Sequence, residues 1–107
     1  MVYLKTDEEV ELLREANLLV GKVLAELAKV IEPGVTTKQL DTIAETFIRD
    51  NGAVPTFKGF PNPYGSPFPA SICASVNYQV VHGIPNDTPL ENGDIVSVDC
   101  GTLLNGF

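Results

Sequence analysis

The acidic residue best placed to do chemistry is Asp99, which lies within residues 94–101 (DIVSVDCG). The β-branched residues around it predict a strand that is buried on both faces. A carboxylate inside such a strand costs free energy unless it is paired, hydrogen-bonded or bound to a metal. Because no Lys or Arg follows Lys58, this half of the chain offers no ion pair. We therefore expect Asp99 to belong to a site, the alternative being an Asp at a strand end that bonds to a turn.

His82 is the only histidine, and we expect a strand at residues 79–82 to deliver it to the turn at residues 83–85 (GIP). A neutral imidazole in that place can donate to a substrate, move a proton or bind a metal, although a lone His is often structural. With Asp99 on a neighbouring strand, the two side chains would share a cavity. One His and one Asp are fewer ligands than a metal centre needs, and no nucleophile elbow accompanies them.

The composition disfavours several classes of protein. The chain has 107 residues and a net charge of −7, with 7 Lys and Arg against 14 Asp and Glu. Nucleic acids and anionic membranes attract the opposite charge. Residues 1–5 do not begin a secretory signal, and the apolar runs are too short to span a membrane. We expect Cys73 and Cys100 to be reduced thiols in the core of a cytosolic protein.

Two amphipathic helices are expected in the first half of the chain, at about residues 6–32 and 36–50. Each begins with a threonine, Thr6 or Thr36, that is followed three residues later by Glu or Gln. This spacing is the capping box, which satisfies backbone groups at a helix start. Apolar residues then recur three and four positions apart, so each helix has an apolar face that the second half must cover.

A long loop is expected at residues 56–70, where Pro and Gly are too dense for regular structure. Aromatic residues are interspersed in it, and they either line a pocket or pack the loop onto the core. They are Phe57, Phe60, Tyr64 and Phe68.

Strands are expected from residue 71 to residue 107, with a hairpin turn at residues 105–106 (NG). The returning strand of that hairpin would begin at Phe107, the last residue of the chain. We therefore expect residues 1–107 to be part of a longer unit.

Residues 80–85 (VVHGIP) and 92–101 (NGDIVSVDCG) together resemble the N-terminal half of bacterial type I methionine aminopeptidases. Residues 73–77 (CASVN) and the opening helices are also similar, so the resemblance runs from about Tyr3 to Phe107. It implies an α/β (α+β) "pita-bread" fold, here two helices packed on an antiparallel-rich sheet. The implied reaction is hydrolytic removal of the initiator methionine from new polypeptides whose second residue is small.

The resemblance implies a role for each matching residue. Asp99 matches the first metal-binding Asp, and His82 matches the His that contacts the substrate and supports the transition state. Phe60, Phe68 and Cys73 match positions that line the pocket for the methionine side chain, which suits a thioether. Residues 61–66 look like added sequence within this loop. Two divalent ions, either Mn, Fe(II) or Co, are implied as cofactors that activate a water.

The resemblance further implies that residues 1–107 are the N-terminal half of one catalytic domain, truncated before its second half. It also implies that the remaining metal ligands, a second Asp, a His and two Glu, lie beyond Phe107. The 107-residue piece is therefore expected to be inactive alone. The implied partner is the N-terminal methionine of a peptide in the cytoplasm, with a monomeric parent, no nucleic acid and no membrane; ribosome association is left open. The alternatives are a prolidase-like peptidase, a non-catalytic pita-bread binding module and a self-standing helix–sheet interaction domain.

Overall fold

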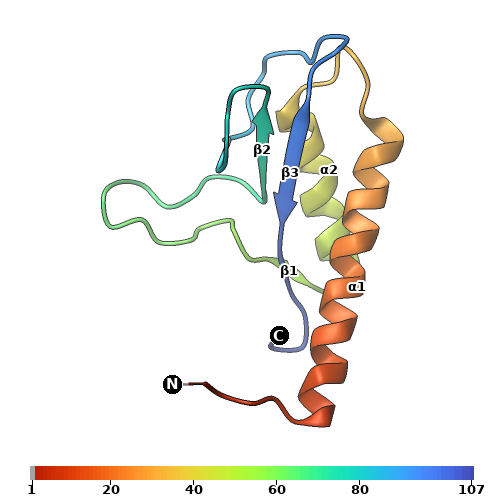
Figure 1. Ribbon diagram of the computed structural model, residues 1–107, viewed down its shortest axis with the longest axis vertical. Helices are drawn as coiled ribbons and strands as arrows, with labels where there is room; N and C mark the ends of the chain where they lie inside the picture. The colour runs from red at the N-terminus through yellow and green to blue at the C-terminus, as the bar shows by residue number, and fades with distance from the viewer. Residues whose placement is uncertain (1) are drawn as a thin grey trace.

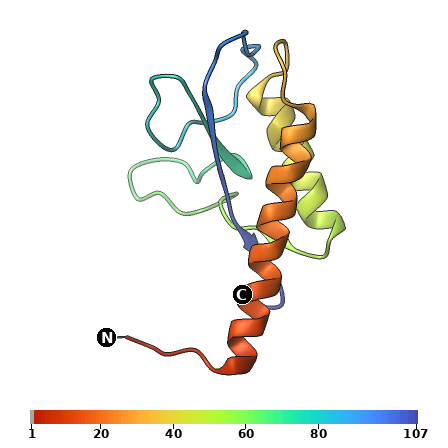
Figure 2. The same cartoon turned by 45° about the vertical axis from the view of Figure 1, so that its right-hand side comes forward.

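Two helices form one layer, two small two-stranded sheets the next, and irregular segments the third. The computed structural model describes residues 2–107. Its elements are α1 (Asp7–Val30), α2 (Thr37–Asp50), β1 (Val54–Pro55), β2 (Ile72–Val76), β3 (Val96–Cys100) and β4 (Thr102–Leu103). Strands β2 and β3 pair antiparallel (Figure 1). Strands β1 and β4 also pair antiparallel. In Figure 2 both helices remain on one side of the strands, and the loops lie on the other.

Both helices begin at the predicted capping boxes. The Glu9 N–H donates to Thr6 Oγ1 at 3.1 Å, and the Thr6 N–H donates to Glu9 Oε1 at 2.9 Å. Thr36 and Gln39 repeat this exchange at 3.1 and 2.8 Å. Within residues 2–107, neither helix is long and apolar enough to cross a membrane.

The core lies between the helices and one face of the sheet. Along β2 and β3, alternate residues pack into it together with α1 and α2, as the pleat of a strand requires. The core-facing residues of the two strands are Ile72, Ala74, Val76, Val96, Val98 and Cys100. The predicted burial of β3 on both faces is wrong, because Ser97 and Asp99 are exposed on the face that the helices do not cover.

The predicted strand at residues 79–82 is also absent, and His82 lies in an irregular segment instead. After β2 the chain turns tightly, and the Val76 N–H donates to the side chain of Gln79 at 2.9 Å. Gln79 thus takes a backbone donor that a neighbouring strand would otherwise use. Further along, the Ala74 N–H donates to the Gly83 carbonyl at 2.9 Å, so the segment runs back beside the free edge of β2.

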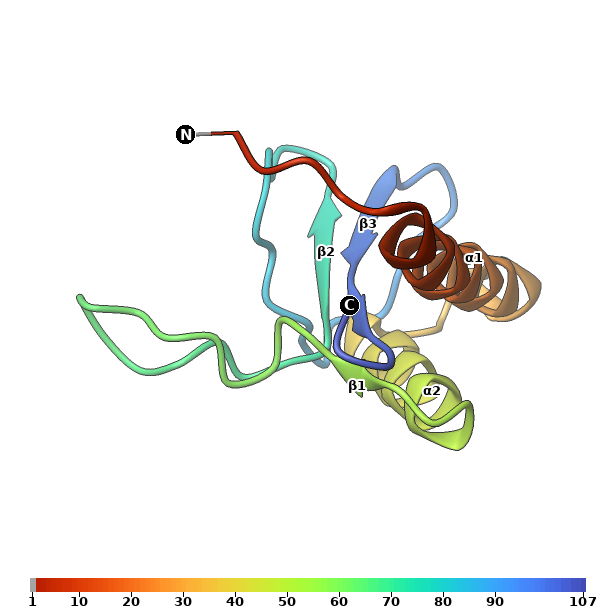
Figure 3. The same cartoon turned by 90° about the horizontal axis from the view of Figure 1, so that it is seen from below.

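The predicted loop at residues 56–70 contains no helix or strand, and it projects away from both helices (Figure 3). Its two arms are paired by backbone bonds. The Gly59 N–H donates to the Phe68 carbonyl at 2.8 Å, and the Phe68 N–H donates to the Phe60 carbonyl at 3.0 Å. The aromatic side chains are therefore carried by a braced loop.

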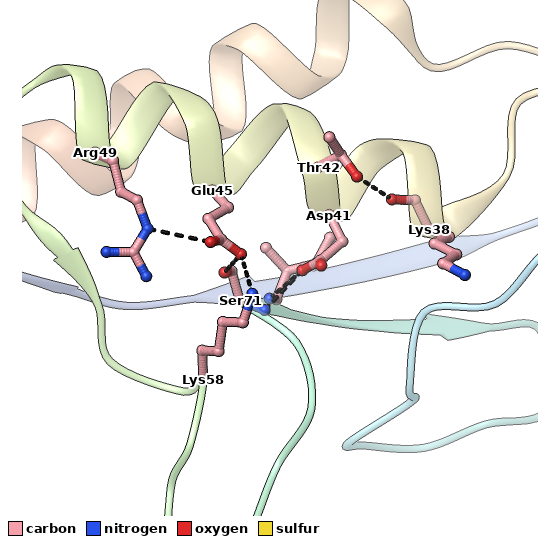
Figure 4. Close-up of polar contacts among 8 residues, drawn as sticks. Lys38, Asp41, Thr42, Glu45, Arg49, Lys58 and Ser71 are labelled. Carbon is pink, nitrogen blue, oxygen red and sulfur yellow. Dashed lines mark hydrogen bonds and ion pairs between the residues drawn. The ribbon is translucent and has the colours of Figure 1, made fainter.

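Two carboxylates of α2 hold both ends of this loop (Figure 4). Glu45 Oε1 accepts from Lys58 Nζ at 2.7 Å and from Ser71 Oγ at 3.0 Å, while Glu45 Oε2 pairs with Arg49 Nε at 3.1 Å. Asp41 Oδ1 accepts from the Ser71 N–H at 2.7 Å and the Ile72 N–H at 2.9 Å. We call Asp41 and Glu45 the α2 anchor.

The predicted hairpin turn at Asn105 and Gly106 is confirmed. Both residues have positive φ, +52° and +82°, as a type I′ turn requires. Leu104 and Phe107 close the turn by exchanging backbone hydrogen bonds of 2.7 and 3.0 Å. Just before it, Thr102 Oγ1 donates to the Ala16 carbonyl at 2.9 Å, which ties β4 to α1.

Replacing Asp41 tests the first part of the α2 anchor. Asp41→Ala would leave the N–H groups of Ser71 and Ile72 without their acceptor, although both residues are fully buried. We expect the free energy of unfolding to fall by about 2 kcal/mol, the usual cost of buried donors that lose a charged partner. Urea titration followed by circular dichroism measures it. Asp50→Ala, at the exposed end of the same helix, is the control and should change stability little; equal losses in both variants would contradict this role.

Glu45 gives the anchor a pH dependence. The hydrogen bond from Lys58, helped by Arg49 and Ser71, lowers the pKa of Glu45 from 4.5 to about 2. A lowered folded-state pKa means that the stabilisation is complete above the unfolded value and is lost as pH falls toward 2. Since Lys58 and Arg49 are about half exposed, solvent screening reduces the effect to about 1–2 kcal/mol.

The matched variant is Glu45→Gln, which cannot ionise. We expect it to be less stable than the unmodified chain at neutral pH and to approach the same stability between about pH 5 and pH 2. Urea titrations at several pH values measure the difference between the two proteins. A difference that stays constant over this range would show that the charge of Glu45 contributes nothing.

Candidate functional site

A cavity of about 580 Å³ opens beside the outer face of the sheet, the face that the helices leave uncovered. Its walls come from the loop at residues 56–70, from β2 and β3, and from the segment that follows the turn after β2. The structure brings all five residues singled out in the sequence to this cavity. They are Phe60, Phe68, Cys73, His82 and Asp99.

Strand register places Cys73 and Asp99 together, because they are Cα partners across β2 and β3. The register is held at the far end of the strands by Asn77. Its Oδ1 accepts from the Ile95 N–H at 3.0 Å, and its Nδ2 donates to Asp94 Oδ1 at 3.0 Å. That bond, with a further one from the Glu91 N–H, lowers the pKa of Asp94. A slip of one residue would turn Asp99 toward the core, so this contact serves the site.

Asp99 is exposed, and the expectation that its carboxylate is buried is wrong. The residues of β3 alternate between core and outer face, so the apolar neighbours of Asp99 in sequence point away from it. Asp99 is not one of the carboxylates that form ion pairs within residues 2–107. Its oxygens are therefore available to a ligand in the cavity.

The rest of the wall is mainly apolar. Of the loop aromatics, Phe57, Phe60 and Phe68 line the cavity, whereas Tyr64 is 96% exposed at the loop tip. Of the two alternatives for the four loop aromatics, lining a pocket or packing onto the core, lining a pocket is therefore correct for three. Ile84 also lines the cavity, and it was not predicted. Its position two residues after His82, directly after Gly83, was the available signal.

The surroundings of the Cys73 and Cys100 thiols make both of them unreactive. Burial, and then the negative charge of Asp99, raises the pKa of Cys73. The same two causes raise the pKa of Cys100 to about 11. A protonated thiol is a poor nucleophile, so Cys73 offers the cavity a polarisable apolar surface. Cys73 is buried as predicted, while Cys100 is only half-buried.

The donors that line the cavity are too few to form a complete metal site. Across the described part of the chain, no group of three His, Cys, Asp or Glu residues could hold a metal ion. Asp99 alone offers exposed carboxylate oxygens in the cavity, which suit hard or borderline divalent ions. Any ion bound here needs further ligands.

Comparisons with known proteins give one consistent result. The family model described as "Metallopeptidase family M24" matches residues 11–107. The chain is 51% identical over 107 residues to a methionine aminopeptidase of Clostridium perfringens. This match covers 100% of this chain but 41% of that relative. The crystal structure of methionine aminopeptidase from Rickettsia prowazekii matches with a TM-score of 0.89 and 39% identity, over 99% of this chain and 41% of that one.

A more distant match defines the fold alone. The crystal structure of the prolidase from Pyrococcus horikoshii is 22% identical, with a TM-score of 0.77 over 94% of this chain and 26% of that one. The match to these structures confirms the predicted α/β pita-bread architecture. Since the family model covers all but the first ten residues, this chain belongs to the M24 metallopeptidases.

Proposed function

We propose that this chain is the N-terminal part of a metal-dependent methionine aminopeptidase, which hydrolyses the initiator methionine from polypeptides with a small second residue. The chain spans about two fifths of the length of its curated relatives, so the activity belongs to a longer protein. The observation that carries the proposal is that one cavity brings Asp99 and His82 together with an apolar wall.

The apolar wall supplies the specificity for methionine. Phe60 and Phe68 are held across from each other by the paired arms of the loop, and Cys73 lies on the adjoining strand. Aromatic rings and sulfur make favourable contacts with a flexible thioether side chain. Such a wall favours an unbranched apolar side chain over a charged one, because a charge would lose its hydration without gaining a partner.

The two polar residues divide the chemical work. Asp99 would hold a divalent ion with its carboxylate, the remaining ligands coming from beyond this chain. Bound divalent ions of the Mn, Fe(II) or Co class supply an activated water and polarise the scissile carbonyl. His82 lines the same cavity, and its imidazole can donate a hydrogen bond to the substrate amide as charge develops.

Location and partners follow from the proposed reaction. We propose that the reaction takes place in the cytoplasm, on the N-terminal methionine of new polypeptides. The complete protein is proposed to be a monomer that binds no nucleic acid, and ribosome association stays an open prediction. A prolidase-like activity is the nearest alternative, but the prolidase match is 22% identical against 51% for the methionine enzyme. The non-catalytic binding module is the other alternative, and the Asp99→Asn variant separates it from the enzyme.

The test compares the complete gene product with variants at both polar residues. We expect it to release methionine from a Met-Ala-Ser peptide and to lose this activity with a chelator. Asp99→Asn should lower kcat/KM at least about a hundredfold and reduce bound metal, because an amide is a weak ligand. His82→Ala should lower kcat about a hundredfold or more, the usual contribution of a positioned imidazole, and leave bound metal unchanged. Peptide hydrolysis and metal analysis are the measurements.

Asp87→Asn is the matched control, since Asp87 is 82% exposed and pairs only with Lys38 on the surface. It should behave as the unmodified enzyme does. The 107-residue chain alone should release no methionine, because its described residues contain no group of three side chains that could hold a metal ion. Full activity and metal content in Asp99→Asn would instead favour the binding-module alternative.

A further inference from the structure

His82 has an unusual backbone conformation. Its φ is +57°, in the left-handed region that residues other than glycine rarely adopt. It lies outside every helix and strand, so no regular ladder holds it in place. Nevertheless its side chain lines the cavity. Something outside its own segment must therefore fix its direction.

The next residue, Gly83, supplies the attachment. Gly83 is buried against β2, and a Cβ atom added to it would overlap the Ala74 carbonyl and lie 2.8 Å from Ser75 Cα. Only a glycine allows the segment to approach the strand this closely. The Gly83 carbonyl accepts from the Ala74 N–H at 2.9 Å, which secures one side of the residue.

The other side is secured by a side chain. The Gly83 N–H donates to Ser75 Oγ at 3.0 Å, and Ser75 is only 4% exposed. This N–H belongs to the peptide unit that joins His82 to Gly83. Because a peptide unit is planar, a bond to its N–H fixes the plane that also carries the His82 carbonyl, and hence the ψ angle of His82.

We propose that Ser75 is a positioning residue, which acts through Gly83 to hold the His82 imidazole toward the cavity. The inference rests on the proposed function for the role of His82, but the contact itself does not. Without Ser75 Oγ, the Gly83 N–H is buried without an acceptor or the segment moves away from β2. In either case the imidazole leaves the geometry that the reaction needs.

The test is a double-mutant cycle in the complete gene product. Ser75→Ala should lower kcat for Met-Ala-Ser about tenfold and change KM less than about twofold, because positioning affects the transition state more than ground-state binding. The double variant Ser75→Ala/His82→Ala should be no slower than His82→Ala alone. Ser75→Thr keeps an Oγ acceptor and should retain most of the activity.

Ser97→Ala is the matched control. Ser97 is the Cα partner of Ser75 on β3 and shares the outer face of the sheet, but the Gly83 N–H bonds to Ser75 and not to it. It should leave kcat unchanged. Hydrogen exchange at the Gly83 amide gives a readout independent of activity, and Ser75→Ala should speed it about tenfold relative to Ser97→Ala.

The outcomes separate the two proposals. The positioning role would be overturned if hydrogen exchange at Gly83 were unchanged in Ser75→Ala. It would also be overturned if the activity losses of Ser75→Ala and His82→Ala multiplied in the double variant. If the enzyme releases no methionine, or if His82→Ala is fully active, the proposed function fails, and Gly83 exchange still decides whether Ser75 holds the segment. If Ser75→Ala does not fold, Ser75→Thr becomes the test. Loss of both activity and protection of the Gly83 amide in Ser75→Thr would also overturn the positioning role.

Discussion

The α2 anchor is the contact on which the arrangement of this chain depends. Asp41 and Glu45 lie one turn apart on a helix, and they accept hydrogen bonds from the start of β2 and from both ends of the long loop. Ser71, just before β2, and Ile72, its first residue, are fully buried, so their N–H groups need partners from within the protein. A carboxylate is a strong acceptor for them. One helix thus sets both where the sheet begins and where the loop departs.

From this anchor the sheet acquires two faces with different tasks. The face toward the helices is apolar and carries the packing, while the outer face carries Cys73, Ser75 and Asp99. Asn77 maintains the register between the two strands, so that the same alternation that buries the core also presents Asp99 to the cavity. Stability and the candidate chemistry therefore depend on different side chains of the same two strands.

Local signals in the sequence were sufficient for the helices and turns. The capping boxes at Thr6 and Thr36 and the Asn-Gly turn depend on contacts between residues close in sequence, and all three are confirmed. The burial of β3 was misjudged, because composition alone does not say how many faces of a sheet are covered. The irregular path before His82 was missed for a related reason, since Gln79 replaces a strand partner through its side chain.

Asp99, His82 and the loop aromatics were singled out from their types and positions in the sequence, and the resemblance added Cys73 and the role of each residue. The contacts that hold these residues required the structure. Asp41 lies 30 residues before Ser71, and Glu45 lies 13 residues before Lys58, so no periodicity connects them. Such distant polar contacts cost chain entropy to close and are specified only once the helix has packed on the sheet. The loop aromatics are consequently held at their base by the same helix that supports the core. A change in α2 that leaves the sheet intact should therefore still alter the apolar wall of the cavity, because the helix contacts the loop directly through Glu45 and Lys58.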